Sequence, residues 1–311
     1  MPRLRLSIAM QTSSCESFQR VVSLPRLNSY RTYFKTNTMD EAIGLYLWNG
    51  EVSSCFASHL AYFEIALRNS IHRAMSLLHS REASESFHWY DATWATLKQT
   101  SRNKINDVRE RRPGCKLSPD EIVSSLSFGF WPVILNNLSP VHASRILSGV
   151  FCHHPLSARS EQWSDARVRR AALDFTLELQ AFRNRLAHHE PLWKFRALRA
   201  QHAGAQAVIL PPSRTQSDSL HRLRRLMTLV EDATGFIDRS LHDDLKYASW
   251  RQRLDFLLTE RGVARYRLRQ HVAAPTVLTP TEFRYRFTAI HRRNQPVKVR
   301  RAHVSGLFVP D

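Results

Sequence analysis

The chain has 311 residues, of which 43% are hydrophobic and 10% aromatic, so it can bury a core as one large or two small globular domains. Its 45 lysines and arginines against 27 acidic residues give a net charge of +18, which favours polyanionic partners such as RNA, DNA or anionic lipid. The four cysteines are widely spaced without a C-x-x-C pair, so neither a disulfide framework nor a zinc ribbon is indicated, and a reducing cytoplasm fits best. No run approaches the roughly 18 apolar residues that span a bilayer, so we expect a cytoplasmic protein without a membrane partner.

Residues 1–20 are predicted to form a basic leader outside the folded domain. Glu16 is the only acid among residues 1–39, which are rich in arginine and serine. The apolar run Leu6–Met10 is too short for a signal peptide. A transit peptide and a misassigned start codon both stay open as explanations of this composition.

Residues 21–260 are predicted to form an all-α helical domain, because helical patterns dominate there and strand patterns are scarce. The strongest helix spans about residues 53–78, where apolar residues recur at spacings of three and four. We expect this stripe in the core: Leu60, Phe63, Leu67, Ile71, Met75 and Leu78.

Further helices are expected along the rest of this domain. Pro113-Gly114 ends one helix, and Ser118 caps the next. The segment Ser127–Pro132 interrupts the helical pattern, and its aromatic residues are more typical of core packing at a helix corner than of base stacking. The expected helices cover residues 91–112, 118 onward, 140–151, 161–189 and 217–261.

Residues 261–311 are predicted to form a separate basic appendage. They contain eleven lysines and arginines against two acids, a net charge of +9 that is half of the excess of the whole chain. Phe283, Tyr285 and Phe287 alternate at period two, which is typical of a short hairpin, whereas the charge pattern is equally typical of a disordered arm. The sequence leaves both structures open.

The segment Ala181–Trp193 brings an arginine, an asparagine and two histidines into one short basic stretch. Arg183 and His188 are separated by four residues, and Asn184 follows the arginine directly. A guanidinium can hold a phosphate, and a histidine can transfer a proton. The alternative interpretation is that Arg183 and Arg185 are surface charges and that His188 is a packed histidine.

A helical projection of this region gives two opposed apolar stripes. The first contains Phe175, Leu179, Phe182 and Leu186, and the second contains Leu173, Leu177 and Ala181 and continues to Asn184 and His188. Because a helix with two apolar faces is buried on both sides, we expect the second stripe to meet a further helix or a partner subunit. Pro191 predicts that the helix ends near His189. His189 projects near the first stripe, which favours a structural role for it and a catalytic role for His188.

Glu64, Arg68 and His72 follow one another at spacings of four, which predicts a salt bridge between Glu64 and Arg68 on a solvated helix face. The alternative is a supporting role in which Glu64 fixes Arg68 near a cleft. Cys152-His153-His154 offers too few ligands for tetrahedral zinc, so we expect no metal. The chain has no Walker-type or dinucleotide glycine loop, and we expect no cofactor.

Five pieces of the chain, in the same order, resemble the abortive-infection (Abi-like) family, whose members look like proteins of the HEPN superfamily. The pieces are Pro25–Tyr30, Ala42–Asn49, Glu64–His72, Ser127–Trp131 and Phe182–Trp193. The resemblance covers about residues 20–245 and leaves out the basic tail. Its most specific parts are Arg68-Asn69 and the segment from Arg183, where Arg183, Asn184 and His188 resemble the R-N-x4-6-H motif of HEPN ribonucleases.

The resemblance implies an all-α, HEPN-like bundle. It also implies a metal-independent endoribonuclease that acts as a toxin in antiviral defence. The implied partners are RNA, a second copy of the chain and a neutralising partner of unknown identity. In such cleavage a base removes the 2′-hydroxyl proton and the oxygen attacks the adjacent phosphorus. Arg183, Asn184 and His188 would form the catalytic site. The supporting residues would be Glu64, Arg68, Asn69, Arg185 and His189. A non-catalytic RNA- or nucleotide-binding protein with the same cleft is the alternative.

Overall fold

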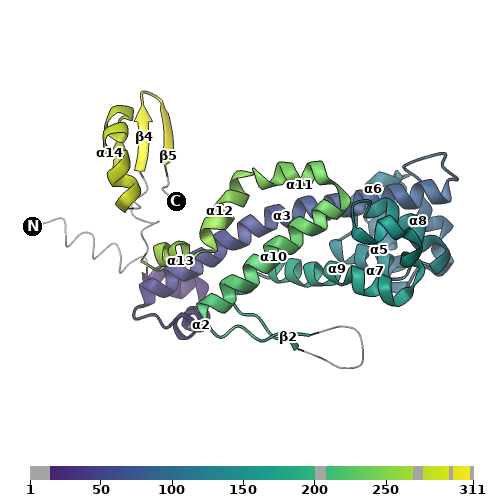
Figure 1. The fold of residues 1–311 in the computed structure, drawn as a ribbon, viewed down its shortest axis with the longest axis horizontal. Coiled ribbons are helices and arrows are strands. Elements are labelled where there is room, and N and C mark those ends of the chain that lie inside the picture. Colours follow the sequence, from purple (N-terminus) through teal and green to yellow (C-terminus); the bar gives the residue numbers. More distant parts are fainter. Residues whose placement is uncertain (1–14, 200–207, 269–275, 294–296, 309–311) are drawn as a thin grey trace, which may run out of the picture. The chain divides into compact units, whose positions relative to one another are not determined.

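The computed structural model describes residues 15–199, 208–268, 276–293 and 297–308, which fold mainly into helices (Figure 1). This confirms the predicted all-α class. The chain divides into two compact units, the first from the described parts of residues 1–54, 213–221 and 253–311, and the second from residues 55–212 and 222–252. Within the described residues, no helix combines the length and the apolar character that a membrane crossing requires.

The first unit contains α2 (Leu24–Phe34), the first part of α3 (Met39–His79), the part of α12 (Ser249–Leu257) from Arg253 onward, and α13 (Glu260–Arg267). The indole N–H of Trp48 in α3 donates to the carbonyl oxygen of Leu257 at 2.8 Å. Gly44 allows α13 to approach α3, because a Cβ at this position would lie 2.0 Å from the carbonyl oxygen of Tyr266. Residue 261, the predicted start of the basic appendage, therefore lies inside α13, a helix that packs in this unit.

Two of the predicted helices are interrupted. Residues 217–261 form α10 (Gln216–Ile237), α11 (Arg239–Lys246) and α12, because Asp238 takes up an extended conformation and its carboxylate caps α11 by accepting from the Leu241 N–H at 2.8 Å. Residues 91–112 form α4 (Trp89–Ala92), η1 (Trp94–Thr96) and α5 (Gln99–Glu110), with Leu97 and Lys98 extended between them. Neither break contains proline or glycine, so the sequence pattern carried no stop signal.

The second unit packs the rest of α3 beside α9 (Ala166–Ala187) through aromatic contacts. Phe56 lies 4.9 Å from Phe182 between ring centroids, and Phe63 lies 6.4 Å from Phe175. The predicted α3 stripe is buried except for half-buried Leu78. The remaining elements of this unit are α6 (Pro119–Ser125), η2 (Phe128–Phe130), α7 (Trp131–Asn136), α8 (Pro140–Val150), η3 (Pro155–Ser164), β1 (Leu198–Arg199) and β2 (Val208–Leu210).

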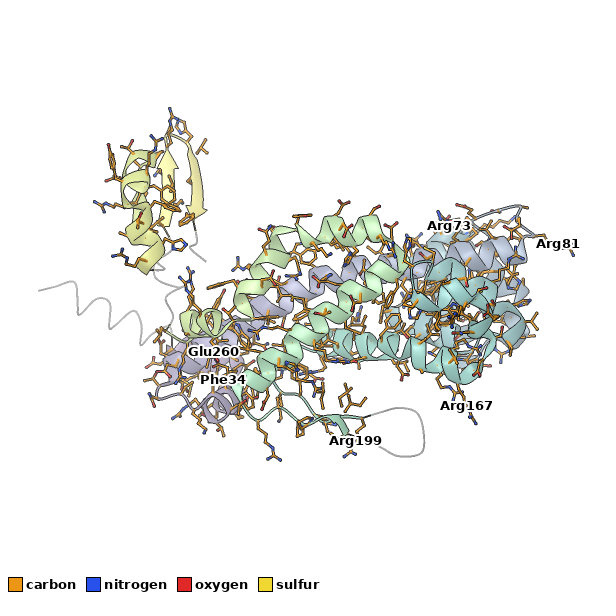
Figure 2. All side chains as sticks on the ribbon, in the orientation of Figure 1. Phe34, Arg73, Arg81, Arg167, Arg199 and Glu260 are labelled. Carbon is orange, nitrogen blue, oxygen red and sulfur yellow. The ribbon has the colours of Figure 1, made fainter. Side chains whose placement is uncertain are left out.

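Two local predictions in the second unit are confirmed. Ser118 and Glu121 form a reciprocal capping box at the start of α6, as the sequence predicted for Ser118. The aromatic residues of the interrupting segment, Phe128, Phe130 and Trp131, are buried in the core. At the start of α9, Asp165 caps the helix by accepting from the Arg167 N–H at 2.7 Å. Figure 2 labels the exposed Arg167 that follows this cap.

The end of the chain forms a small α/β structure rather than a hairpin over residues 283–287. β3 (Thr276–Leu278) pairs in parallel with β4 (Val297–Arg301), which pairs antiparallel with β5 (Val304–Phe308), and α14 (Pro280–Arg293) connects β3 to β4. Phe283 and Phe287 are four residues apart on α14, and both contact Phe308. Tyr285 is 85% exposed, so the period-two pattern belongs to two sides of a helix. The hairpin lies further along, between β4 and β5.

Candidate functional site

The motif helix α9 ends in a Schellman closure that fixes both histidines. His188 is the C-cap, and His189 adopts a positive φ of 51°. The N–H of His189 donates to the carbonyl oxygen of Leu186 at 3.0 Å. The N–H of Glu190 donates to the carbonyl oxygen of Arg185 at 2.9 Å. The backbone of His189 therefore closes the helix, while the His188 side chain is exposed at its end.

Arg185 folds back over the segment that follows the helix. Its guanidinium donates to the carbonyls of Pro191 at 2.6 Å and Lys194 at 3.0 Å, and it lies 4.9 Å from the ring centroid of Phe195. Burial lowers the pKa of Arg185, and the nearby Glu190 carboxylate at 3.5 Å opposes this. These contacts give Arg185 a structural task.

Arg222 is a residue of this region that the sequence interpretation missed. Its guanidinium also lies 4.9 Å from the centroid of Phe195, and it donates to the carbonyl of Pro211 at 3.1 Å. Arg222 comes from α10, far along the chain from the motif, so spacing gave no signal for it. Together, Arg185 and Arg222 hold the segment after α9 in place.

Arg183 lies against Glu64 of α3, with 3.7 Å between Nε and Oε2. The ion pair that Glu64 forms is therefore with Arg183, whereas the sequence predicted one with Arg68. Burial raises the pKa of Glu64, and the charges of Arg183 and Arg68 oppose this rise. The two most specific pieces of the family resemblance thus meet at one contact between α3 and α9.

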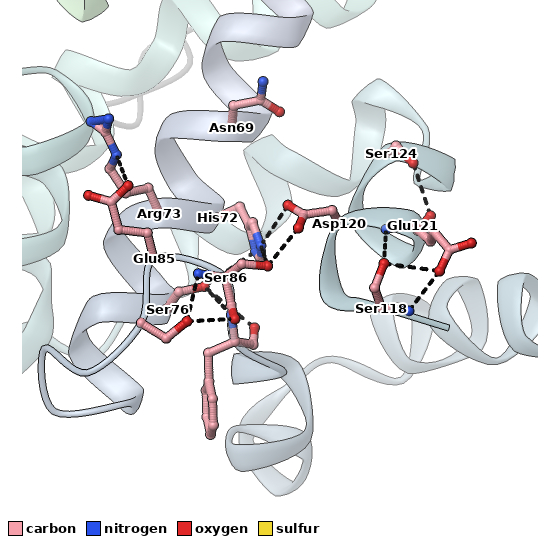
Figure 3. Close-up of polar contacts among 12 residues, drawn as sticks. Asn69, His72, Arg73, Ser76, Glu85, Ser86, Ser118, Asp120, Glu121 and Ser124 are labelled. Atoms are coloured by element: carbon pink, nitrogen blue, oxygen red, sulfur yellow. Dashed lines mark hydrogen bonds and ion pairs between the residues drawn. The ribbon is translucent and has the colours of Figure 1, made fainter. Parts of the chain in front are cut away.

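Arg68 turns toward α6 and the neighbouring amide. It donates through Nη1 to the carbonyl of Ser124 at 3.3 Å and through Nε to Oδ1 of Asn69 at 3.3 Å. One turn further along α3, His72 reaches the other end of α6, where its Nε2 lies 3.5 Å from Oδ1 of Asp120 (Figure 3). Arg68 and His72 therefore fasten α6 to α3 at both of its ends.

His72 is a buried structural histidine. The indole N–H of Trp89 donates to its Nδ1 at 3.0 Å, which places the proton of the neutral ring on Nε2, facing Asp120. Ser86 donates to the other oxygen of Asp120 at 2.7 Å (Figure 3). Burial lowers the pKa of His72, although the Asp120 charge opposes this effect.

The two stripes predicted for α9 have different surroundings. Phe175, Leu179 and Phe182 of the first stripe are buried, as predicted. In the second stripe Leu173 is fully buried and Leu177 is half-buried, so at Leu173 the stripe packs inside its own chain, which is the first of the two alternatives that the sequence left open. Ala181 and the stripe's continuation, Asn184 and His188, are exposed. The stripe therefore leaves the core and reaches the surface at the motif.

The arrangement offers a cation, an amide and an imidazole at one end of α9. Arg183 is half-buried beside Glu64, and Asn184 and His188 are exposed. Arg183 and His188 lie about 140° apart around the helix axis at about 100° per residue. Within the described residues no three His, Cys, Asp or Glu side chains gather as a metal-binding group.

Comparison with known proteins gives one match. The family model of the Abi-like proteins matches residues 15–194, which is more than half of the chain and includes all five pieces quoted above. No curated protein and no solved structure matches the chain.

Proposed function

Because this chain belongs to the family of Abi-like proteins, which indicates a role in abortive infection, we propose that it is a metal-independent endoribonuclease. The observation that carries this proposal is the contact between Glu64 and Arg183, which joins the two motif pieces on one surface of the second unit. The acid holds the guanidinium at a fixed place but leaves it 40% exposed, where a phosphate can reach it.

The proposed reaction uses these side chains in separate tasks. His188 transfers the proton to or from the reacting oxygens, and it lies at a helix end that is open to solvent. Arg183 neutralises the charge that develops on the phosphate, and Asn184 orients the phosphate or the imidazole. The net charge of +18 concentrates RNA near the protein.

The test is a cleavage assay with purified protein, RNA substrates and an excess of EDTA. We expect cleavage products that carry a 2′,3′-cyclic phosphate, because the attacking oxygen is the 2′-hydroxyl. Binding of RNA without cleavage, in the presence or absence of divalent metal, would instead identify the non-catalytic RNA-binding protein that the sequence left as the alternative.

The active unit in this proposal is a homodimer. One copy holds Arg183 and His188 on different sides of α9, so two copies can share the two tasks across a two-fold axis. Half-buried Leu177 and exposed Ala181 of the second stripe offer surface for this contact.

Substituting Ala181 by Asp is expected to abolish the dimer and RNA cleavage together, because it places an unpaired charge at the contact. Light scattering and the cleavage assay measure the two effects. The matched control is Ala171→Asp, because Ala171 is also an exposed alanine and lies near the start of α9. A dimeric Ala181→Asp variant with normal cleavage would place the contact elsewhere.

A chain truncated after residue 275 is expected to keep the helices from α2 to α13 folded but to bind RNA more weakly. Residues 276–311 carry seven lysines and arginines against two acids, whereas a deletion from residue 261 would also remove buried Val263 and Tyr266 of α13. Each lost phosphate contact should flatten the slope of log K against log salt by about 0.7 for single-stranded RNA. An unchanged slope would show that this segment does not touch RNA.

A further inference from the structure

Gly129, in the middle of the buried aromatic turn η2, lies beside two polar side chains from different helices. A Cβ at this position would lie 2.7 Å from Nε2 of Gln180 in α9 and 3.7 Å from Nζ of Lys104 in α5. The two nitrogens therefore approach the same point, and the missing side chain of Gly129 leaves them room. The neighbouring Phe128 and Phe130 are buried and hold the turn in place.

Lys104 and Gln180 are half-buried. Across the described ranges, neither side chain has a hydrogen-bond or ion-pair partner in the protein. An ammonium offers three N–H donors and a primary amide offers two. Half-buried donors that converge without a protein acceptor suit an external acceptor, and the charge of Lys104 selects an anionic one.

Glu178, the acid of α9 that is nearest to Gln180 in sequence, does not pair with Lys104. Both oxygens of Glu178 accept from Arg225, one of them at 2.8 Å. Gln180 precedes Arg183 by three residues, so the two side chains are neighbours on the surface of α9, with about 5–6 Å between their Cβ atoms. The point over Gly129 is thus adjacent to the proposed phosphate contact.

We propose that Lys104 and Gln180 form a second phosphate subsite over Gly129, which holds the backbone phosphate next to the one at Arg183. This inference rests on the proposed function, because it takes RNA as the ligand of the Arg183 region. A flexible ammonium contributes a point charge to binding, so Lys104 affects KM rather than kcat. The subsite recognises the RNA backbone and carries no base preference.

The test measures binding of a single-stranded RNA whose 2′-hydroxyls are methylated, so that it cannot be cleaved. Fluorescence anisotropy over a series of KCl concentrations gives the slope of log K against log salt. Lys104→Ala is expected to weaken binding severalfold and to flatten the slope by about 0.7. Lys104→Arg should retain the slope, and Gln180→Glu should weaken binding because it places a carboxylate beside the phosphate.

Lys116→Ala is the matched control, since Lys116 is an exposed lysine in the loop between α5 and α6. It should leave affinity and slope close to those of the wild type. A Lys104→Ala slope equal to that of the wild type or of Lys116→Ala would overturn the subsite.

Parallel cleavage of unmodified RNA separates this inference from the proposed function. If the wild-type chain binds RNA but does not cleave it, and Lys104→Ala flattens the slope, the endoribonuclease proposal is overturned and the subsite is supported. If the wild type cleaves RNA and the slope of Lys104→Ala equals that of the wild type, the subsite alone is overturned. No binding by the wild type at low salt would overturn both.

Discussion

His188→Ala is expected to lower the rate of RNA cleavage by about 10²–10⁴-fold, which is the usual contribution of a general acid or base. Arg183→Ala should lower it by on the order of 10²–10³-fold, because a charged donor to the developing phosphorane is lost. Both side chains lie outside the core, so circular dichroism should show folded variants. The proposed toxicity in growing cells should fall with the cleavage rate.

Two matched controls accompany these variants. His189→Gly retains the backbone closure of α9, because glycine adopts the positive φ of this position readily, and should cleave RNA normally. Arg167→Ala removes an exposed arginine from the other end of the same helix and should also be active. Full activity of folded His188→Ala, or loss of activity only in His189→Gly, would contradict the assignment of His188.

The free energy of unfolding is expected to fall by about 3 kcal/mol as the pH drops from 6.5 to 4, through His59 alone. This histidine of α3 is 1% exposed, and its ring lies 5.0 Å from that of Trp250. Burial, with smaller contributions from Arg251 and His242, lowers its pKa to about 4. Below pH 6.5 the unfolded chain binds a proton that the folded chain does not, so acid favours unfolding over this window.

Urea unfolding followed by tryptophan fluorescence at several pH values measures this effect. His59→Leu should show a pH dependence that is weaker by about 3 kcal/mol between pH 6.5 and 4. Some dependence should remain, because burial also lowers the pKa values of His72, His79 and His154. His153→Leu, at an exposed site, is the control. Equal pH dependence in His59→Leu and the wild type would contradict the prediction, because it would show that the pKa of His59 is the same in the folded and the unfolded chain.

Local patterns in the sequence predicted the helical elements well. The stripe from Leu60 to Met75, the cap at Ser118 and the end of α9 before Pro191 each depend on residues close in sequence. The breaks at Asp238 and Lys98 were missed, because a polar residue on an exposed helix face has the same pattern as a polar residue at a cap. For residues 283–287 the sequence left a short hairpin and a disordered arm open, whereas the structure has a helix there, because two phenylalanines four apart fit a helix equally well.

The site was harder to predict, because its contacts join distant segments. Spacing paired Glu64 with Arg68 on one helix, whereas the fold brings Glu64 to Arg183. The contact of Arg222 with Phe195 and the approach of Lys104 to Gly129 also join distant segments, so sequence spacing could not predict them. The choice of Arg183, Asn184 and His188 as catalytic residues came from the family resemblance and stays a prediction.

The closure at the end of α9 has a consequence for the evolution of this segment. The backbone bonds from His189 and Glu190 and the bonds from Arg185 to Pro191 and Lys194 each join residues at fixed separations. One inserted residue between His188 and Pro191 would break several of these bonds at once. Relatives should therefore align without gaps from the motif to Phe195, and an engineer who transplants the motif must move this stretch as one block.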